Sequence, residues 1–190
     1  MIVARTAELA EEYLDADTMI CSQCRGRLIR WGYGRTRTIR SHGRTTVTVR
    51  PRRVRCTDCH NTHIVLPAAF TARRADTTAV IGEALSHKAN GIGYRRIAEL
   101  LDRPAATVRR WLARATPHHL RWMWQQGVSR LIMVNRKAYS GLAFSADGVR
   151  NALLALCAAA YWDRHRFGFP ESPWTLIGIY TRGRLLAPPR

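Results

Sequence analysis

Apolar residues recur at helical spacing in two adjacent segments near the middle of the chain. In residues 94–101, Ile97, Leu100 and Leu101 lie three or four positions apart, which places them on one face of a helix. The next segment, residues 104–115, repeats this spacing with Val108, Trp111, Leu112 and Ala115. Residues 102–104 read Asp-Arg-Pro, and proline suits the first turn of a new helix rather than the interior of an old one. The pattern therefore predicts two short helices joined by a tight corner at residues 102–103.

A third helix is predicted just before this pair. It covers residues 76–89 and is closed by Gly91 and Gly93. Its apolar side consists of Val80, Ile81, Ala84 and Leu85. Three helices at about 76–89, 94–101 and 104–115 make up the core of a helix-turn-helix. A helical hairpin within a bundle, with its arginines facing solvent, is the alternative interpretation.

Residues 19–72 have a different pattern, in which short β-type runs lie around two cysteine pairs. The runs are residues 28–33, 36–40, 45–49 and 63–66. Each pair has the spacing Cys-x-x-Cys, which can direct two thiolates at one ion, and four thiolates complete a tetrahedral site. This layout predicts a zinc ribbon that holds a structural Zn²⁺ through Cys21, Cys24, Cys56 and Cys59. The 31 residues between the pairs exceed the common spacing and predict an additional hairpin.

Two other uses of this segment compete with the zinc ribbon. Redox chemistry is the main rival for a Cys-x-x-Cys motif, but two pairs with strands between them and no βαβ pattern argue against it. His42, His60 and His63 are candidate substitutes for a cysteine ligand, although exposed turn or strand histidines are the plainer interpretation.

Both ends of the chain are predicted to be helical. Residues 6–14 form a short amphipathic helix capped by Thr6, residues 67–75 form a linker, and further helices follow over 118–134, 147–164 and 172–181. Ser145 and Ser172 are the predicted caps of the last two helices, and the unpaired Cys157 falls on an apolar face. The predicted fold class is α+β. It divides into an N-terminal helix (1–18), a small β-rich zinc ribbon (19–72), a trihelical helix-turn-helix (73–117) and a helical C-terminal region (118–190).

The charge changes the functional picture. The chain has 31 Lys and Arg residues against 13 acids, for a net charge of +18, which indicates a polyanionic partner and most simply nucleic acid. Only Lys88 and Lys137 are lysines, and such an arginine excess can also reflect the base composition of a genome. The distribution is more informative, because residues 18–74 contain thirteen arginines and a single acid.

The predicted helix 104–115 has the features of a DNA-reading helix. Small residues at its start can approach base edges in the major groove, while arginines one turn further on reach guanine or phosphate. The candidate contacts on the helical unit are Arg95, Arg96, Ala105, Ala106, Thr107, Arg109, Arg110 and Arg114. Arginines of the ribbon, among them Arg50, Arg52 and Arg53, are candidate phosphate contacts.

The order of these motifs carries a resemblance. The segments CSQC, WGYGR, RRVRCTDCHNTHIVLP, GYRRIAELLDRPAATVRRWLARA and SPWTLIGIYTRGRLLAP resemble short actinobacterial proteins in which a zinc ribbon precedes a transposase-like helix-turn-helix. The resemblance covers roughly residues 19–116 well and 172–188 more loosely. It implies a DNA-binding protein related to the front end of transposases, with Cys21, Cys24, Cys56 and Cys59 as the ribbon cysteines and Pro104–Ala115 as the recognition helix. The knuckle that commonly reads CPxCG reads CSQCRG here.

Several other classes fit less well. A DDE nuclease needs three carboxylates on a sizeable sheet, whereas after residue 117 only Asp147, Asp163 and Glu171 are present, on or between predicted helices, so we expect caps and surface charges and no enzyme. The longest apolar run, Ala152–Ala160, is short for a membrane span, and the first residues lack the order of a signal peptide. We expect a cytoplasmic, nucleoid-associated protein without a membrane or small-molecule substrate.

Two functions remain open at this stage. The first is a transcriptional regulator or transposition accessory that binds double-stranded DNA, with the C-terminal helices packing the unit or pairing two copies as a homodimer. The alternative is an adaptor or subunit of a nucleoprotein assembly that binds RNA or a protein partner. Its docking surface would use Trp122, Trp124, Trp162 and Trp174, although packing in the helical core is the simpler role for these residues.

Overall fold

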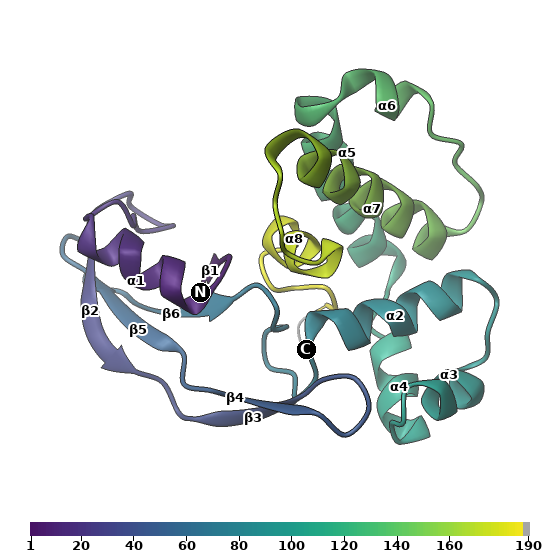
Figure 1. Ribbon diagram of the computed structural model, residues 1–190, viewed down its shortest axis with the longest axis horizontal. Helices are drawn as coiled ribbons and strands as arrows, with labels where there is room; N and C mark the ends of the chain where they lie inside the picture. The colour runs from purple at the N-terminus through teal and green to yellow at the C-terminus, as the bar shows by residue number, and fades with distance from the viewer. Residues whose placement is uncertain (188–190) are drawn as a thin grey trace.

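The computed structural model describes residues 1–187 and has an α+β architecture, with small sheets at one end and helices at the other (Figure 1). Strands β1 (Ile2–Ala4), β2 (Leu28–Tyr33), β5 (Arg52–Cys56) and β6 (Thr62–Pro67) form a four-stranded sheet in the order β1-β6-β5-β2. Strands β3 (Arg37–Arg40) and β4 (Thr46–Val49) form a separate hairpin. The pairing of β1 with β6 is parallel, and the other pairings are antiparallel.

Helix α1 (Ala7–Asp15) packs on one face of the four-stranded sheet. Its N-cap is Thr6, whose hydroxyl accepts a hydrogen bond from the Leu9 N–H, as the sequence predicts. Ala10 and Leu14 of the helix join Leu28 and Val54 of the sheet in one small core. This core is the ordinary consequence of alternation along a strand, because every second side chain points to the same face.

Ion pairs reinforce this contact. Glu11 of α1 binds Arg52 at 2.6 Å and Arg30 at 3.1 Å, and Asp15 binds Arg30 at 2.7 Å. The acidic first helix therefore folds back on the basic sheet and neutralises arginines on the face that it covers.

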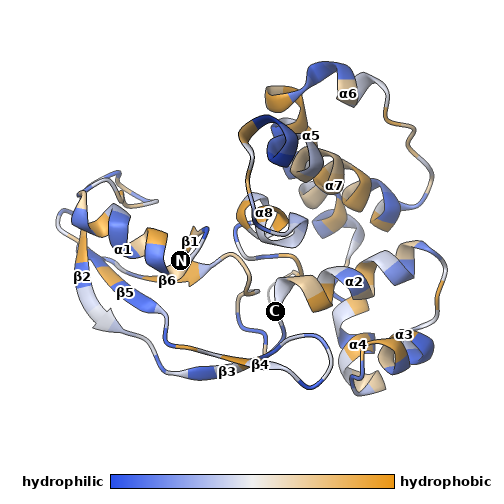
Figure 2. Cartoon of the chain, viewed as in Figure 1, coloured by the Kyte–Doolittle hydropathy of each residue, from blue (hydrophilic) through white to orange (hydrophobic). Residues whose placement is uncertain are grey.

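The helical end consists of seven helices within the described residues. They are α2 (Thr78–Ala89), α3 (Tyr94–Leu100), α4 (Ala105–Leu112), α5 (Pro117–Val134), α6 (Arg136–Ser140), α7 (Gly148–Phe167) and α8 (Pro173–Tyr180). Apolar residues are prominent along α7 and α8 (Figure 2). One hydrophobic cluster contains Ile81 of α2, Ile97 of α3 and Val108 of α4 together with Leu156 of α7 and Ile177 of α8. The three-helix unit thus shares its core with the C-terminal helices. Among residues 1–187, no helix has both the length and the apolar character needed to cross a bilayer.

Some expectations from the sequence are wrong in detail. The sequence pattern did not predict strands β1 and β5, because β1 is only three residues long and β5 is rich in arginine. Residues 67–75 are not an open linker, since Ala68 and Phe70 are buried and the Ala68 carbonyl accepts a hydrogen bond from the Thr78 hydroxyl. The cap of α7 is Asp147 rather than Ser145.

The helical faces also differ from expectation at two positions. Leu100 is exposed, because the short helix α3 buries only Ile97 and Ala98. Cys157 lies on the solvent side of α7 rather than on its buried face, and Tyr161 lies on the same side one turn further on. The unbroken buried face of α7 instead follows its alanines and leucines.

Gly127 allows α5 and α7 to approach closely. The helix α5 continues through this glycine without a break, and a Cβ placed there would lie 2.6 Å from the Leu156 nitrogen and 2.9 Å from the Ala155 Cβ. Two helix backbones can come this near only where one of them lacks a side chain. Gly127 is therefore a packing residue and not a helix breaker.

We predict that Gly127→Ala destabilises the fold, because the added methyl group meets the α7 backbone, which cannot move without disturbing the shared core. The expected loss is about 1–3 kcal/mol in the free energy of unfolding, measured by urea denaturation. Gly141→Ala is the matched control, since the nearest atom to its added Cβ is 3.7 Å away. Equal effects of the two substitutions would contradict this interpretation.

Candidate metal centre and nucleic-acid interface

The four cysteines predicted as ligands come together at the end of the sheet. The sulfurs of Cys21, Cys24, Cys56 and Cys59 all lie within 4.8 Å of one another. Two contacts join one pair to the other, at 3.8 Å for Cys21–Cys59 and 3.4 Å for Cys24–Cys56. Four thiolates around one tetrahedral ion at ordinary zinc–sulfur distances are separated by about 3.8 Å. The arrangement is that of a Cys₄ metal site.

The two knuckles have matching backbone geometry. The Cys21 N–H donates to the Gly26 carbonyl and the Cys56 N–H donates to the Asn61 carbonyl, each five residues further along. The residue after each second cysteine has a positive φ, +68° at Arg25 and +57° at His60. Such left-handed residues turn the chain sharply, and here they direct both cysteines of a pair to the same side.

The backbone of each knuckle also favours thiolates. The backbone N–H of Cys24 lowers the pKa of Cys21, and that of Asn61 lowers the pKa of Cys59 to about 6. At Cys24 the backbone N–H of Gly26 acts in the same direction, but the neighbouring sulfurs of Cys56, Cys59 and Cys21 together with burial outweigh it, so that the pKa rises to about 12. These neighbouring thiols therefore compete for ionisation, and a bound cation would stabilise them as thiolates.

The three candidate histidines separate into different environments. His63 is buried, and its Nε2 lies 3.4 Å from the Cys21 sulfur, next to the four cysteines rather than in place of one. His60 occupies the positive-φ position of the second knuckle. His42 is exposed and lies 2.7 Å from the Glu83 carboxylate. Only His63 is placed to influence the metal site, through the sulfur that it contacts.

Helix α4 presents a basic face to solvent. Its buried side holds Val108 and Trp111, which belong to the shared hydrophobic core. Its exposed side begins with Ala105 and Ala106 and continues with Arg109 and Arg110, as the sequence predicts. Thr107 is half-buried, and its hydroxyl accepts a hydrogen bond from Arg110 at 3.3 Å.

More arginines gather around this face. Arg74, in the segment before α2, has its pKa lowered by burial and by the like charges of Arg114 and Arg110. Its Nε is buried without a hydrogen-bond partner among the described residues. Arg95 and Arg96 are exposed at the start of α3, where Arg96 also pairs with Glu99 at 2.8 Å. The surface beside α4 is therefore strongly positive.

The three ribbon arginines predicted as phosphate contacts lie in different places. Arg52 is occupied within the chain, since it binds Glu11 and the Tyr33 hydroxyl and its side chain is only 14% exposed. Arg50 is exposed and lies over the Tyr33 ring, 4.8 Å from the ring centroid. Arg53 points to the opposite face of the sheet from Val54, a core residue.

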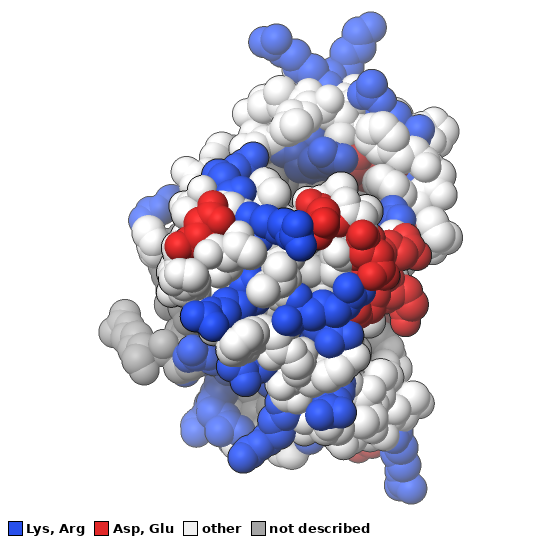
Figure 3. Space-filling model, turned by 90° about the vertical axis from the view of Figure 1, so that its left-hand side faces the viewer, with Lys and Arg blue, Asp and Glu red and all other residues white. Residues whose placement is uncertain are grey.

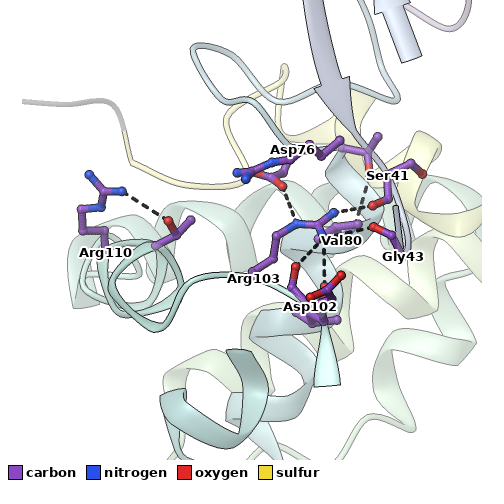
Figure 4. A network of polar contacts seen from close by, with 11 residues as sticks. Ser41, Gly43, Asp76, Val80, Asp102, Arg103 and Arg110 are labelled. Atoms are coloured by element: carbon purple, nitrogen blue, oxygen red, sulfur yellow. Dashed lines mark hydrogen bonds and ion pairs between the residues drawn. The ribbon is translucent and has the colours of Figure 1, made fainter. Parts of the chain in front are cut away.

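Sequence reasoning missed the residue that fixes α4 in place. Arg103, at the corner before the helix, is buried, and its Nε donates to the Asp76 carboxylate at 2.7 Å (Figure 4). Its other nitrogens donate to the backbone carbonyls of Ser41 and Gly43 in the β3–β4 loop. The second Asp76 oxygen binds Arg40 at 2.8 Å. The hairpin, the start of α2 and the corner of the helix pair are thus joined through one carboxylate and one guanidinium.

No sequence signal distinguishes Arg103 from the other arginines of the chain. The only hint is that Asp76 is one of few acids in a basic region, and its burial depends on a partner 27 positions away. A contact of this range follows from the fold, not from local pattern.

The three carboxylates of the C-terminal region do not form a cluster. Asp147 caps α7, and Glu171 binds Arg5 at 2.8 Å. Asp163 is buried, contrary to the expectation of a surface charge, and it accepts hydrogen bonds from Arg130 and the Tyr180 hydroxyl. Each of the three therefore has a structural role in capping or pairing.

Comparison with known proteins gives one match. A family model described as a domain of unknown function (DUF6431) matches residues 21–111, from the first cysteine ligand to Trp111. The matched region contains the metal site, the β3–β4 hairpin and the three helices α2, α3 and most of α4. Searches of curated proteins and of solved structures found no match.

We predict that the purified chain contains one tightly bound metal ion and that Cys24→Ala removes it. With one thiolate lost, the ribbon should lose several kcal/mol of stability, because binding energy at such sites is folding energy. Metal analysis and thermal denaturation measure the two effects. Cys157→Ala is the control and should keep the ion, since Cys157 lies on α7, away from the cluster. Retention of the metal in Cys24→Ala would contradict the assignment.

We also predict that Asp76→Ala costs about 3–5 kcal/mol of stability, because it leaves the buried Arg103 charge without its carboxylate. The two side chains are only 3% and 2% exposed. Glu99→Ala is the matched control, since it breaks only the exposed pair with Arg96 and should cost less than about 1 kcal/mol. Chemical denaturation compares the stability of the two variants. A small loss of stability for Asp76→Ala would contradict the role of the buried Asp76–Arg103 pair in joining the hairpin to the helices.

Proposed function

We propose that this chain is a zinc-containing DNA-binding protein, a transcriptional regulator or transposition accessory, in which α4 reads duplex DNA as the second helix of a helix-turn-helix. The observation that carries the proposal is the exposed face of α4. Small residues at its start, Ala105 and Ala106, are followed by Arg109 and Arg110, and no C-terminal helix covers them in the described part of the chain. That is the sequence of contacts that a helix entering the major groove needs.

Zinc is the ion that best suits the four cysteines. Thiolate ligands select soft or borderline ions, and an all-cysteine tetrahedral set is typical of structural zinc. The sulfurs of one pair contact those of the other at 3.8 Å and 3.4 Å, and all four lie within 4.8 Å of one another, which supports a shared ion over a redox disulfide confined to either motif.

The positive surroundings of α4 support a phosphate backbone as ligand. Arg74, Arg110 and Arg114 lie near enough to repel one another, which a polyanion would relieve. The β3–β4 loop, fixed by Arg103, brings the exposed Arg44 to the same side as the helix corner. The same surface would attract any duplex, and α4 would then supply the preference among sequences.

A binding role also accounts for the acids better than catalysis does. Asp147, Asp163 and Glu171 are used for capping and ion pairs, so we infer that the chain is not a metal-dependent nuclease.

We predict that Arg109→Ala changes the sequence preference of DNA binding, because base-edge contacts carry the discrimination. A lost bidentate contact costs about 1–3 kcal/mol at one position of the site. Selection of bound sequences from a random duplex pool, performed on the native chain and the variant, measures the change. Equal weakening on selected and random duplexes would contradict α4 as the reader.

Two further arginine variants serve as comparisons for Arg109→Ala. Arg44→Ala should weaken all duplexes alike and reduce the slope of log affinity against log salt by about 0.9, as expected for one phosphate contact. Arg136→Ala removes the same charge from α6, at the far side of the helical end (Figure 1), and should have little effect.

A further inference from the structure

The four-stranded sheet has a second face that no helix of the described residues covers. Alternation along the strands places six residues there that are not buried, Ile29, Trp31, Arg53, Arg55, Thr62 and Ile64, whereas Leu66 further along β6 faces the same side and is buried in a cluster with Ile39, Val49 and Phe70. We name these six residues the open face. On the other face Leu28 and Val54 pack beneath α1, and Arg30 reaches the α1 carboxylates. The open face is therefore the side of the sheet opposite α1 (Figure 1).

The charges of the two faces are unequal. The acids of the N-terminal segment pair with Arg27, Arg30 and Arg52. Within residues 1–187, no ion pair joins Arg53 or Arg55 to a carboxylate, and residues 18–74 supply only one acid, Asp58. Figure 3, which views the sheet end of the molecule, shows basic side chains over much of the surface and the acids gathered in a few clusters. The open face keeps its positive charge.

An aromatic ring stands among these arginines. Trp31 is 46% exposed, and the Arg55 guanidinium lies over its ring at 4.7 Å from the centroid. The guanidinium occupies one face of the indole, and about half of the Trp31 surface remains exposed. A shift of the strand register after Arg30, with φ of +85° at Gly32, turns the following Tyr33 toward Arg52 on the α1 side. Trp31 is thus the single aromatic residue of the open face.

A basic groove continues from the open face. It has a volume of about 630 Å³, is lined by Thr62 and Ile64, and contains four arginines from three segments of the chain. These are Arg35, Arg37, Arg73 and Arg184. The apolar side chains of Leu66 and Leu186 also line the groove. A groove lined by both arginines and apolar side chains suits a ligand with a charged backbone and flat apolar groups.

We propose that the open face and this groove bind an unpaired strand of nucleic acid, with a base stacked on Trp31 and phosphates held by Arg53, Arg55 and the groove arginines. This is a second binding surface, separate from α4, and it does not depend on the duplex-reading role of that helix. Proteins that bind single strands combine a basic track with aromatic stacking platforms in this way. A duplex fits poorly, because its bases are already stacked on one another and cannot reach an indole on a flat sheet.

The test uses the full-length, metal-loaded chain and two fluorescein-labelled oligonucleotides of 12 positions, one of thymidines and one with the same backbone but abasic. Trp31→Ala should weaken binding of the thymidine strand roughly tenfold or more, and should leave the abasic strand nearly unchanged, because only stacking is lost. Fluorescence anisotropy measures both affinities, and a uridine RNA strand shows whether the sugar matters.

Two further variants separate this surface from the rest. Arg53→Ala should weaken both strands and reduce the salt slope by about 0.7, the value for one phosphate contact on a single strand. Tyr161→Ala, an exposed aromatic on α7, is the matched control and should change neither affinity. Metal content and circular dichroism confirm that each variant is folded.

The outcomes are distinct. If Trp31→Ala binds the thymidine strand as tightly as the native chain does, or loses the same factor on both strands, the stacking role is wrong. Arg109→Ala should leave single-strand binding intact. A failure of α4 to read duplex DNA would therefore leave this proposal standing, and loss of single-strand binding in Arg109→Ala would show that one surface serves both ligands and would overturn it.

Discussion

The carboxylate of Asp76 lies between Arg40 and Arg103, and this buried group joins the sheet end of the molecule to the helices. The other nitrogens of Arg103 donate to carbonyls of the β3–β4 loop and of the corner residues Leu101 and Asp102. Because an uncompensated buried charge is costly, the loop, the start of α2 and the corner before α4 can adopt only a narrow range of relative positions. The orientation of α4 with respect to the sheet that carries the four cysteines follows from this constraint.

The fold distributes charge unevenly over the surface. The acids of the N-terminal segment form ion pairs with arginines on the covered face of the sheet, where Glu11 binds Arg30 and Arg52. Within residues 1–187, no ion pair joins a carboxylate to Arg53 or Arg55 of the open face or to Arg109 or Arg110 of α4. A net charge of +18 says only that the chain attracts polyanions. The fold divides this charge between the sheet face beneath α1, which is largely neutralised, and two positive surfaces, the open face and the exposed side of α4. This division suggests separate binding surfaces.

The metal site is the part of the structure where local pattern and tertiary geometry agree best. Two Cys-x-x-Cys motifs predict four converging thiolates, and the four sulfurs do converge. The agreement has a simple cause, since each knuckle is a local turn whose geometry is set within six residues, and a tetrahedral ion accepts only one way of joining two such turns. The family model that matches residues 21–111 covers this site together with α2, α3 and most of α4.

The sequence by itself determined the elements whose signals are local: the cysteine pairs, the cap at Thr6, and a helix with an apolar and a basic side within the predicted range 104–115, which the structure shows over Ala105–Leu112. Spacing and capping are short-range physics, so they can be read from the order of residues. Only the tertiary structure decided which arginine is buried, which glycine allows two helices to touch, and that Asp163 is paired inside the core. Those outcomes depend on partners tens of residues away, and no local pattern records which groups will meet when the chain folds.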